Sequence, residues 1–374
     1  MKILIAINGP LTYSIAPSSR LIYIAKSLKK KGFNVEVLGG KSEKINGLKT
    51  TTVTGKKQIL RLKIPLLIYK KAATQKYTHV IVRGVDLAFF LLPLKFLTTK
   101  IILDFHEWMY REIKLYYEKS LYNKFKVVIY YLIEKIVVRY SDIVICVSKG
   151  VRELLNEREK KKSVVLENGL DIKEALNIVY TTKKERKKTI IKHSLPENAF
   201  LLGFMGNWER QLDMESVFKA CKIAKVNIIV IGEGPGITFF KDKWKSNVLF
   251  TKRLPRAEAL KIISVCDAAI VPYKDDETVP VGYFSQRKVK DYLGLGKPIL
   301  MANVKGRERF LIPYENVIFY HPSNIEDLAQ KIRIIMSDEK ITEKMRKNNI
   351  TLARRFNWQV LVEKSGIIEK LRAP

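Results

Sequence analysis

The chain has 374 residues, of which 47% are hydrophobic and 28% charged, and this balance excludes a largely disordered protein. Its 69 lysines and arginines outnumber its 37 aspartates and glutamates, which gives a formal net charge of +32. Such a charge predicts an anionic partner, and the classes that remain are phosphate-bearing substrates, an anionic membrane surface and nucleic acid. The basic residues are spread along the chain, however, as they also are on an ordinary solvated surface.

The cysteines and the lengths of the apolar runs indicate in which cellular compartment the protein is located. Cys146, Cys221 and Cys266 lie far apart in apolar segments, which predicts buried thiols in a reducing compartment and neither a disulfide framework nor a metal site. The N-terminal run ILIAI is too short for the core of a signal peptide, and LAFFLLPL at 87–94 is too short to span a bilayer. We therefore expect a cytoplasmic protein that at most binds the inner face of the cell membrane peripherally.

The first half of the chain alternates between strand and helix patterns. KILIAI predicts a buried strand that NGP at 8–10 breaks, and Leu21, Ile24, Ala25 and Leu28 then recur at helical spacing. Helical patterns separate the next apolar runs, which predict strands at 33–38, 78–83, 100–105, 142–148 and 163–168. This alternation predicts a parallel, doubly wound sheet.

A charged stretch at 171–198, which contains TTKKERKK, interrupts the pattern and predicts a linker. A second strand–helix series follows, with strands predicted at 201–206, 227–235, 248–251, 267–273 and 297–302. The fold class is therefore α/β, with two Rossmann-like domains whose parallel sheets face a central cleft. We expect an N-terminal domain at 1–170, joined by a C-terminal helix at 357–374, then the linker 171–198 and a C-terminal domain at 199–356.

Two glycine-containing loops follow predicted strands and are candidate nucleotide contacts. Gly9 precedes a helix whose first turn carries Ser18, Ser19 and Arg20, and a helix N-terminus attracts anions. Gly232 and Gly234 lie in IGEGPG at 231–236. The GxGxxG fingerprint of dinucleotide-binding proteins is not found, and either loop is also typical of a simple tight turn.

The segment SQRKVKDYLGLGKP at 285–298 combines a helix pattern with charged side chains that could bind a nucleotide. Ser285 suits the N-cap of a helix on which Lys288 and Asp291 follow at steps of three and so share one face. A carboxylate there can hold a ribose diol, and a lysine can bind phosphate. The alternative is an ordinary ion pair on a helix surface.

DFHEW at 104–108 places a histidine directly after a predicted strand. Ligands bind such sheets beyond the carboxyl ends of the strands, so we expect His106 to face the cleft. Asp104 is expected to cap the helix that begins near Glu107, and the alternative is that His106 itself caps this helix.

Several stretches, taken together in their order along the chain, resemble the retaining glycosyltransferases of family 4, which have the GT-B fold. The matching stretches are KILIAINGP, DFHEW, VICVSKGV (144–151), VVLENGLDI (164–172), LLGFMGNWER (201–210), IIVIGEGP (228–235), DAAIVPY (267–273), SQRKVKDYLGLGKPIL (285–300) and RRFNWQVLVEK (354–364).

The resemblance implies roles for individual residues. His106 matches the histidine that hydrogen-bonds the transferred sugar, and Asp291 occupies the place where the family usually has a glutamate that binds the ribose. Asn207 and Arg210 lie in the loop that binds the diphosphate, where Arg210 would stabilise charge on the leaving group.

The sequence also departs from the family pattern. The first of two glutamates eight positions apart is replaced by Tyr283, and the second by the shorter Asp291. The residue after Arg210 is Gln211, so Lys288 or Arg287 would supply the second cation of the diphosphate site. An inactive homologue therefore remains an alternative.

The resemblance implies a retaining hexosyltransferase that uses a nucleotide-diphosphate sugar and a glycan or lipid-linked acceptor. The donor would bind the C-terminal domain and the acceptor the N-terminal domain. No metal or other cofactor is expected, since Asp275 and Asp276 lack the D-x-D spacing of metal-dependent transferases.

Two rival functions remain. A nucleotide-sugar epimerase on the same fold would need further carboxylates, for which Glu107 and Glu277 are the candidates. A nucleic-acid-binding protein would need basic residues interleaved with stacking aromatic residues on one face, and the sequence shows no such stripe.

The segment 110–135 is expected to bind an anionic membrane surface, because Lys, Arg and Tyr alternate there with apolar residues. An amphipathic core helix is the alternative.

Overall fold

The computed structural model describes residues 1–41, 43–106, 108–116, 120–179, 187–188, 190–192, 199–208, 211–234, 237–244, 247–275, 286–305 and 310–373. The chain divides into two compact units. The first consists of Met1–Asn168 and Trp358–Pro374, and the second is Gly169–Asn357.

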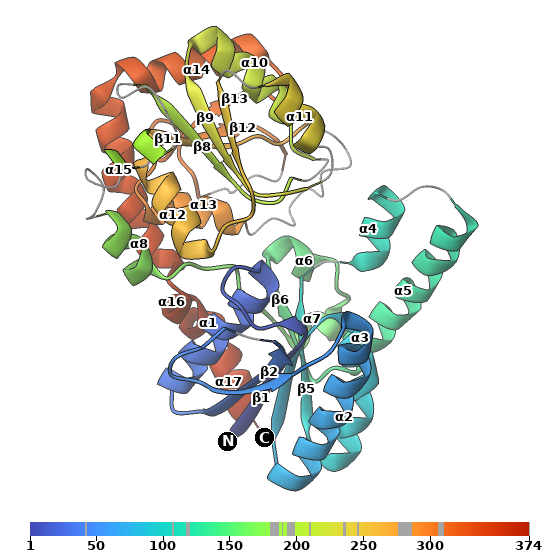
Figure 1. The fold of residues 1–374 in the computed structure, drawn as a ribbon. Helices are drawn as coiled ribbons and strands as arrows, with labels where there is room; N and C mark the ends of the chain where they lie inside the picture. Colours follow the sequence, from blue (N-terminus) through green and yellow to red (C-terminus); the bar gives the residue numbers. More distant parts are fainter. Residues whose placement is uncertain are drawn as a thin grey trace. The chain divides into compact units, whose positions relative to one another are not determined.

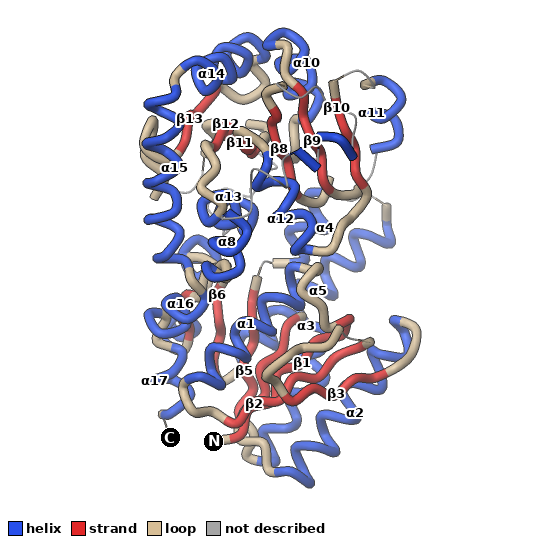
Figure 2. Tube along the Cα trace, turned by 60° about the vertical axis from the view of Figure 1, so that its left-hand side comes forward, coloured by secondary structure: helices blue, strands red, loops and turns tan. Residues whose placement is uncertain are grey.

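The first unit is built on a seven-stranded sheet whose strand pairs are all parallel, in the order β3-β2-β1-β4-β5-β6-β7. Its strands are β1 (Lys2–Pro10), β2 (Asn34–Gly40), β3 (Lys49–Val53), β4 (His79–Arg83), β5 (Lys100–Phe105), β6 (Ile143–Cys146) and β7 (Ser163–Val165). The runs predicted as strands are buried, as expected where helices cover both faces of a parallel sheet. Figure 2 shows these strands in red between the helices.

Helices cover both faces of this sheet (Figure 1). On one face, α1 (Ala16–Lys30), α16 (Trp358–Lys364) and α17 (Ile367–Arg372) share a core with alternate residues of the strands. On the other face lie α2 (Lys57–Gln75), α3 (Val85–Leu91), the 3-10 helix η1 (Leu92–Leu97) and α5 (Leu121–Tyr140). The shorter helices are α4 (Met109–Tyr116), α6 (Lys149–Glu153) and α7 (Glu157–Lys161).

The NGP segment differs from the prediction, because β1 continues through it to Pro10. After a register shift, Pro10 pairs with Gly40 at the end of β2. An added Cβ at Gly39 would lie 2.9 Å from the carbonyl oxygen of Gly9, whereas an added Cβ at Gly9 would meet nothing within 4 Å. Glycine is thus required by protein contacts in β2, and the ligand contact suggested for Gly9 stays a prediction.

The second unit is also Rossmann-like, with a six-stranded parallel sheet in the order β10-β9-β8-β11-β12-β13. Its strands are β8 (Leu201–Met205), β9 (Asn227–Ile231), β10 (Val248–Thr251), β11 (Ala268–Val271), β12 (Ile299–Ala302) and β13 (Val317–Tyr320). Its helices are α8 (Ile172–Val179), α10 (Met214–Ala224), α11 (Ile237–Lys243), α12 (Arg256–Val265), α13 (Arg287–Gly294), α14 (Ile325–Ser337), α15 (Glu339–Ala353) and the short η2 (Arg354–Phe356). The strand order reverses between β8 and β11, which is where such sheets bind ligands.

The predicted linker begins with a helix of the second unit. α8 contacts α12 and α13, and an added Cβ at Gly294 would lie 2.4 Å from Leu170 Cδ1 and 3.0 Å from Ala175 Cβ. The apolar side of IKEALNIV therefore packs closely on α13. In the sequence, this helical pattern is hard to recognise because a charged stretch follows it directly. Most of the remaining linker residues lie outside the described residues.

The GKP sequence after α13 has a structural role. Lys297 Nζ donates to the carbonyl oxygens of Ser264 and Cys266 at 2.6 and 2.7 Å, where α12 ends. Cations are favourable at helix C-termini because the last carbonyl groups lack intrahelical partners. As predicted, Cys146, Cys221 and Cys266 are buried free thiols.

Candidate active site

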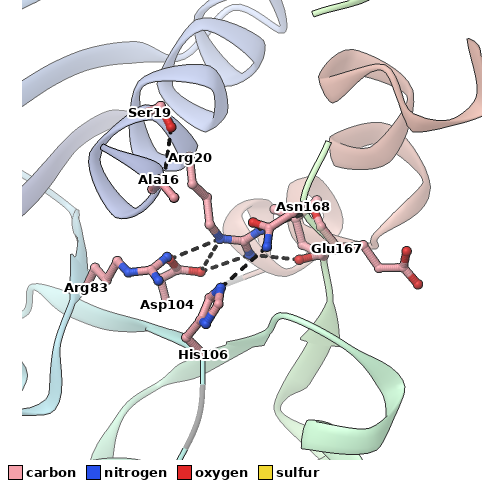
Figure 3. Close-up of polar contacts among 9 residues, drawn as sticks. Ala16, Ser19, Arg20, Arg83, Asp104, His106, Glu167 and Asn168 are labelled. Atoms are coloured by element: carbon pink, nitrogen blue, oxygen red, sulfur yellow. Dashed lines mark hydrogen bonds and ion pairs between the residues drawn. The ribbon is translucent and has the colours of Figure 1, made fainter. Parts of the chain in front are cut away.

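Arg20 of α1 is the hub of a buried polar cluster at the carboxyl ends of β4, β5 and β7 (Figure 3). Its Nε donates to both carboxylate oxygens of Asp104 at 3.0 and 3.1 Å, and its Nη2 to the Leu166 carbonyl at 2.7 Å. Its Nη1 donates to the Glu167 carbonyl and to Asn168 Oδ1 at 3.1 and 3.2 Å. Arg20 is thus bound inside the unit, which differs from its expected place in an anion-binding first turn of α1.

Asp104 is held between two guanidinium groups and does not cap the helix that follows it. Besides the Arg20 contacts, it accepts from Arg83 Nη1 at 3.2 Å, and it is buried. The helix cap is instead Glu134 of α5, which accepts from the Met109 and Tyr110 backbone N–H groups at 2.5 and 3.3 Å. The predicted capping role of Asp104 is therefore wrong, because two cations from α1 and β4 bind this carboxylate.

His106, just beyond β5, is neutral in this setting. Burial, followed by the positive charges of Arg83 and Arg20, holds the pKa of His106 well below its usual range. Arg20 can only donate, so the Asn168 amide oxygen faces Arg20 and its nitrogen faces His106 Nε2, at 3.5 Å. A hydrogen bond from the amide nitrogen favours the tautomer in which Nε2 accepts and Nδ1 carries the ring proton. In this tautomer the neutral ring of His106 can donate through Nδ1.

In the second unit, the loops after β8 and β9 touch through glycine. An added Cβ at Gly232 would lie 2.0 Å from the Gly206 carbonyl oxygen, and one at Gly234 would lie 2.2 Å from that of Trp208. Gly232 also has a φ of +141°, which disfavours other residues. The close approach predicted for Gly232 and Gly234 is thus made to protein backbone, and a nucleotide contact there stays a prediction.

Lys288 lies where the strand order of the second sheet reverses. Its Nζ is 4.8 Å from the ring centroid of Phe204 in β8 and 5.6 Å from that of Tyr273, just after β11. It also borders Gly206, since an added Cβ there would lie 3.0 Å from Nζ. A cation is therefore positioned at the switch point, where open α/β sheets bind phosphate-bearing ligands.

Asp291 on the same helix is buried and has a partner that the sequence did not reveal. Arg256, the first residue of α12, binds its two carboxylate oxygens through Nη1 and Nη2 at 2.8 and 2.7 Å. The Arg256 Nε also donates to Glu174 Oε2 at 3.2 Å. A carboxylate has about four acceptor positions, so this bidentate pair leaves acceptor capacity for the predicted ribose contact.

Asp291→Ala is expected to lower the free energy of unfolding by roughly 3 kcal/mol, because it removes the bidentate partner of the nearly buried Arg256. Calorimetric titration with nucleotide, below the melting temperature of the variant, tests the ribose role separately. The matched control is Arg256→Ala, which breaks the same ion pair but keeps the carboxylate. If Asp291→Ala binds nucleotide as tightly as Arg256→Ala does, Asp291 does not belong to the donor site.

Several predicted site residues lie outside the described residues, namely Arg210, Ser285, Glu107, Tyr283 and Glu277. The N-cap position of α13 is Gln286, in place of the expected Ser285. Asn207 Oδ1 accepts from Arg253 Nη2 at 3.1 Å, so a further arginine stands at this edge of the sheet. Arg253 and Arg256 were missed, although the run TKRLPR directly after an apolar strand was a usable signal.

Two family models match the chain: Glycosyltransferase Family 4 over residues 18–174 and Glycosyl transferases group 1 over residues 185–351. An uncharacterized glycosyltransferase of Methanocaldococcus jannaschii is 23% identical over 226 residues, or 59% of this chain. That match spans only 57% of the length of the relative.

Solved structures resemble the whole chain. Sucrose-phosphate synthase from Thermosynechococcus elongatus has a TM-score of 0.76 at 15% identity, over 99% of this chain and 98% of that one. HepE of Anabaena in complex with UDP-glucose has a TM-score of 0.72 at 17% identity, over 99% of both chains. These likenesses show a shared fold, the two Rossmann-like units of GT-B proteins. With family models matching both halves of the sequence, the chain belongs to the glycosyltransferases of family 4.

Proposed function

We propose that the protein is a retaining hexosyltransferase that moves a sugar from a nucleotide-diphosphate sugar to a glycan or lipid-linked acceptor. The observation that carries the proposal is the position of Lys288 against Gly206 at the switch point of the second sheet. The fold neighbour HepE, which was solved with UDP and with UDP-glucose, supports a nucleotide sugar as the class of donor.

In this proposal the second unit binds the donor. Lys288 and Asn207 contact the diphosphate, Asp291 the ribose, and Gly232 and Gly234 the nucleotide, together with Arg210 and Ser285 from the family pattern. Preorganised cations stabilise the negative charge that develops on a diphosphate leaving group, and this is the task of Lys288 and Arg210. We propose that these cations act without a metal ion or another cofactor.

The first unit, in this proposal, binds the acceptor and contacts the transferred sugar. His106 is a suitable contact because it is neutral, and its Nδ1–H can donate to a sugar oxygen without placing a further full charge beside Arg20 and Arg83. A neutral donor of this kind orients the sugar and leaves bond cleavage to the cations of the donor site.

The test of this function begins with a panel of nucleotide-diphosphate sugars, titrated by calorimetry and assayed for hydrolysis without acceptor. Lys288→Ala is expected to weaken donor binding roughly 10-fold or more, the usual effect of losing one charge-assisted hydrogen bond. Lys340→Ala, an exposed lysine of α15, is the matched control and should bind as the native protein does. NMR of the released sugar reports the anomeric configuration, and inversion would contradict a retaining reaction.

The same assay separates the rivals. An epimerase would convert the sugar while it is still attached to the nucleotide, and the carboxylates that it would need, Glu107 and Glu277, lie outside the described residues. Failure of every nucleotide sugar to bind would contradict the proposed function.

We propose that the acceptor is reached at the inner face of a membrane, to which the protein binds peripherally from the cytoplasm. Among the described residues, no helix is long and apolar enough to cross a bilayer. A bilayer-bound acceptor would therefore have to be met at the bilayer surface.

A further inference from the structure

The helices α2, η1 and α5 of the first unit carry large apolar side chains on their solvent side. Six of these side chains are between 53% and 90% exposed: Leu62 and Leu66 of α2, Phe96 of η1, and Phe125, Val128 and Leu132 of α5. Exposed apolar side chains that gather on one face of a soluble protein mark an interaction site more often than single exposed ones do. We refer to these six residues as the outer apolar face.

The helices that carry the outer apolar face lie on one face of the sheet, with α3 packed between α2 and α5 (Figure 1). α3 contacts both α2 and α5, and the Tyr69 hydroxyl of α2 donates to the Phe90 carbonyl of α3 at 2.7 Å. Helices that cover one face of a sheet all turn their solvent sides away from it. The exposed side chains therefore point to the same side of the unit.

α5 is apolar on both its inner and its outer side. Val137 and Val138 are fully buried, while Leu121, Phe125, Val128 and Leu132 follow each other at steps of four, three and four and are exposed. A surface helix normally turns its apolar stripe to the core and its polar residues to solvent. The outer stripe of α5 therefore indicates an apolar contact that the unit itself does not supply.

The charges around this face are almost all positive. α2 contains no acidic residue, and its Arg61, Lys63 and Lys70 are exposed. In α5 the only acidic residue is Glu134, which is fully buried as the cap of α4, whereas Lys124 and Arg139 are exposed. The surface thus combines exposed apolar side chains with unbalanced positive charge.

We propose that the outer apolar face binds an anionic lipid bilayer, with its aliphatic and aromatic side chains in the headgroup region and its lysines and arginines on the lipid phosphates. Buried apolar area and attraction to anionic lipids are the two terms that bind interfacial helices. A second copy of the chain would bring the same positive charge against itself, so self-association is disfavoured.

Nucleic acid is the other anionic candidate, and it would need basic residues interleaved with stacking aromatic residues on one face. Tyr122, Phe125, Tyr131 and Tyr140 of α5 are exposed, but Tyr122 and Tyr131 are nine positions apart and so lie on opposite sides of the helix. In addition, the aliphatic side chains Leu62, Leu66, Val128 and Leu132 offer no flat surface on which bases can stack, whereas they suit the apolar part of a bilayer.

The position of α5 connects this surface with the candidate site. A helix of 20 residues is about 30 Å long, whereas the six residues of β5 span about 20 Å. Since α5 leads into β6, its N-terminal half extends past the carboxyl ends of the strands, and Figure 1 shows it projecting there with α4. His106 follows the end of β5 at this same edge. The inference rests on the proposed function in one respect, because a lipid-linked acceptor would be presented here.

The test uses the full chain and sedimentation with vesicles, either of phosphatidylcholine alone or mixed with phosphatidylglycerol. We expect binding to the mixed vesicles that weakens at high salt, and little binding to phosphatidylcholine. The double variant Phe125→Ser/Leu132→Ser should reduce binding roughly 10-fold or more. Its matched control, Ile312→Ser/Met336→Ser, changes two exposed apolar residues of the second unit and should bind normally.

A second pair of variants tests the charge. Lys63→Gln/Lys124→Gln should weaken binding to the mixed vesicles at low salt, whereas Lys340→Gln on α15 should not. Melting temperature and nucleotide-sugar titration without vesicles accompany each variant, so that loss of folding or of the proposed donor function is recognised separately. Lack of vesicle binding in a protein that still binds donor would overturn the inference alone.

Three further results would overturn it. The first is equal binding to both kinds of vesicle regardless of salt. The second is concentration-dependent self-association that Phe125→Ser/Leu132→Ser abolishes, which would assign the face to a second copy. The third is preferential binding of RNA that competes with the vesicles.

Discussion

Asp104→Ala is expected to lower the free energy of unfolding by roughly 3–5 kcal/mol, the usual cost of removing one partner from a buried ion pair. The side chain of Arg20 is only 1% exposed, and it would lose the carboxylate that both Nε and Nη2 contact. Arg83 would lose its contact as well. Two positive charges would then face each other at the end of β5 without an anion between them.

Chemical denaturation measures this effect, and two comparisons define its cause. Glu363→Ala breaks the ion pair with Lys31, in which both side chains are more than 40% exposed, and should cost no more than about 1 kcal/mol. Asp104→Ala/Arg20→Met also removes the buried cation that Asp104→Ala leaves without a counter-charge, so its loss of stability should be smaller than the sum of the losses of Asp104→Ala and Arg20→Met measured singly. If Asp104→Ala lowers the free energy of unfolding by less than about 1 kcal/mol, the buried cluster of Arg20, Arg83 and Asp104 does not stabilise the fold as proposed.

Most of the fold was predictable because it depends on local patterns. Buried parallel strands require short apolar runs, and each strand predicted from such a run is present in the described part of the chain. The strand β3, KTTTV, was missed because this edge strand has almost no apolar residues and little burial. The helix α8 was missed because it adjoins a charged stretch, and the two were predicted together as one linker.

The polar clusters were less predictable because their members are far apart in the sequence. Arg20 and Asp104 are separated by 84 residues, and Arg256 and Asp291 by 35. A single sequence shows that each residue is charged but not which of them meet. The position of His106 directly after β5 followed from the strand pattern, and that of Lys288 on α13 followed from the helix pattern, whereas the partners that hold Asp104 and Asp291 required the structure.

His106→Ala is expected to reduce glycosyl transfer roughly 100-fold or more while the melting temperature stays nearly unchanged, since one positioned donor to the reacting sugar is lost. The opposite pattern is expected for Asp104→Ala, whose activity should fall only as far as folded protein is lost. A His106→Ala variant that melts early and keeps its activity per folded molecule would show that the two roles are reversed.

The same reasoning predicts that Asn168 acts on transfer through His106. In Asn168→Asp a carboxylate faces Nε2, so the ring proton moves from Nδ1 to Nε2 and the pKa of His106 rises, because an anion favours the imidazolium. Transfer should fall at neutral pH although His106 is still present. The control is Glu167→Gln, because the Glu167 side chain points away from His106 (Figure 3) and only its carbonyl contacts Arg20.

Nitrogen NMR of histidine-labelled protein measures this tautomer directly, with His106→Gln to assign the signal. In the native protein the signal should show a protonated Nδ1 and should not titrate near pH 6.5, because burial, Arg83 and Arg20 disfavour the charged ring. A protonated Nε2 in the native protein would mean that Asn168 does not orient this ring, and that His106 presents an acceptor rather than a donor to the sugar.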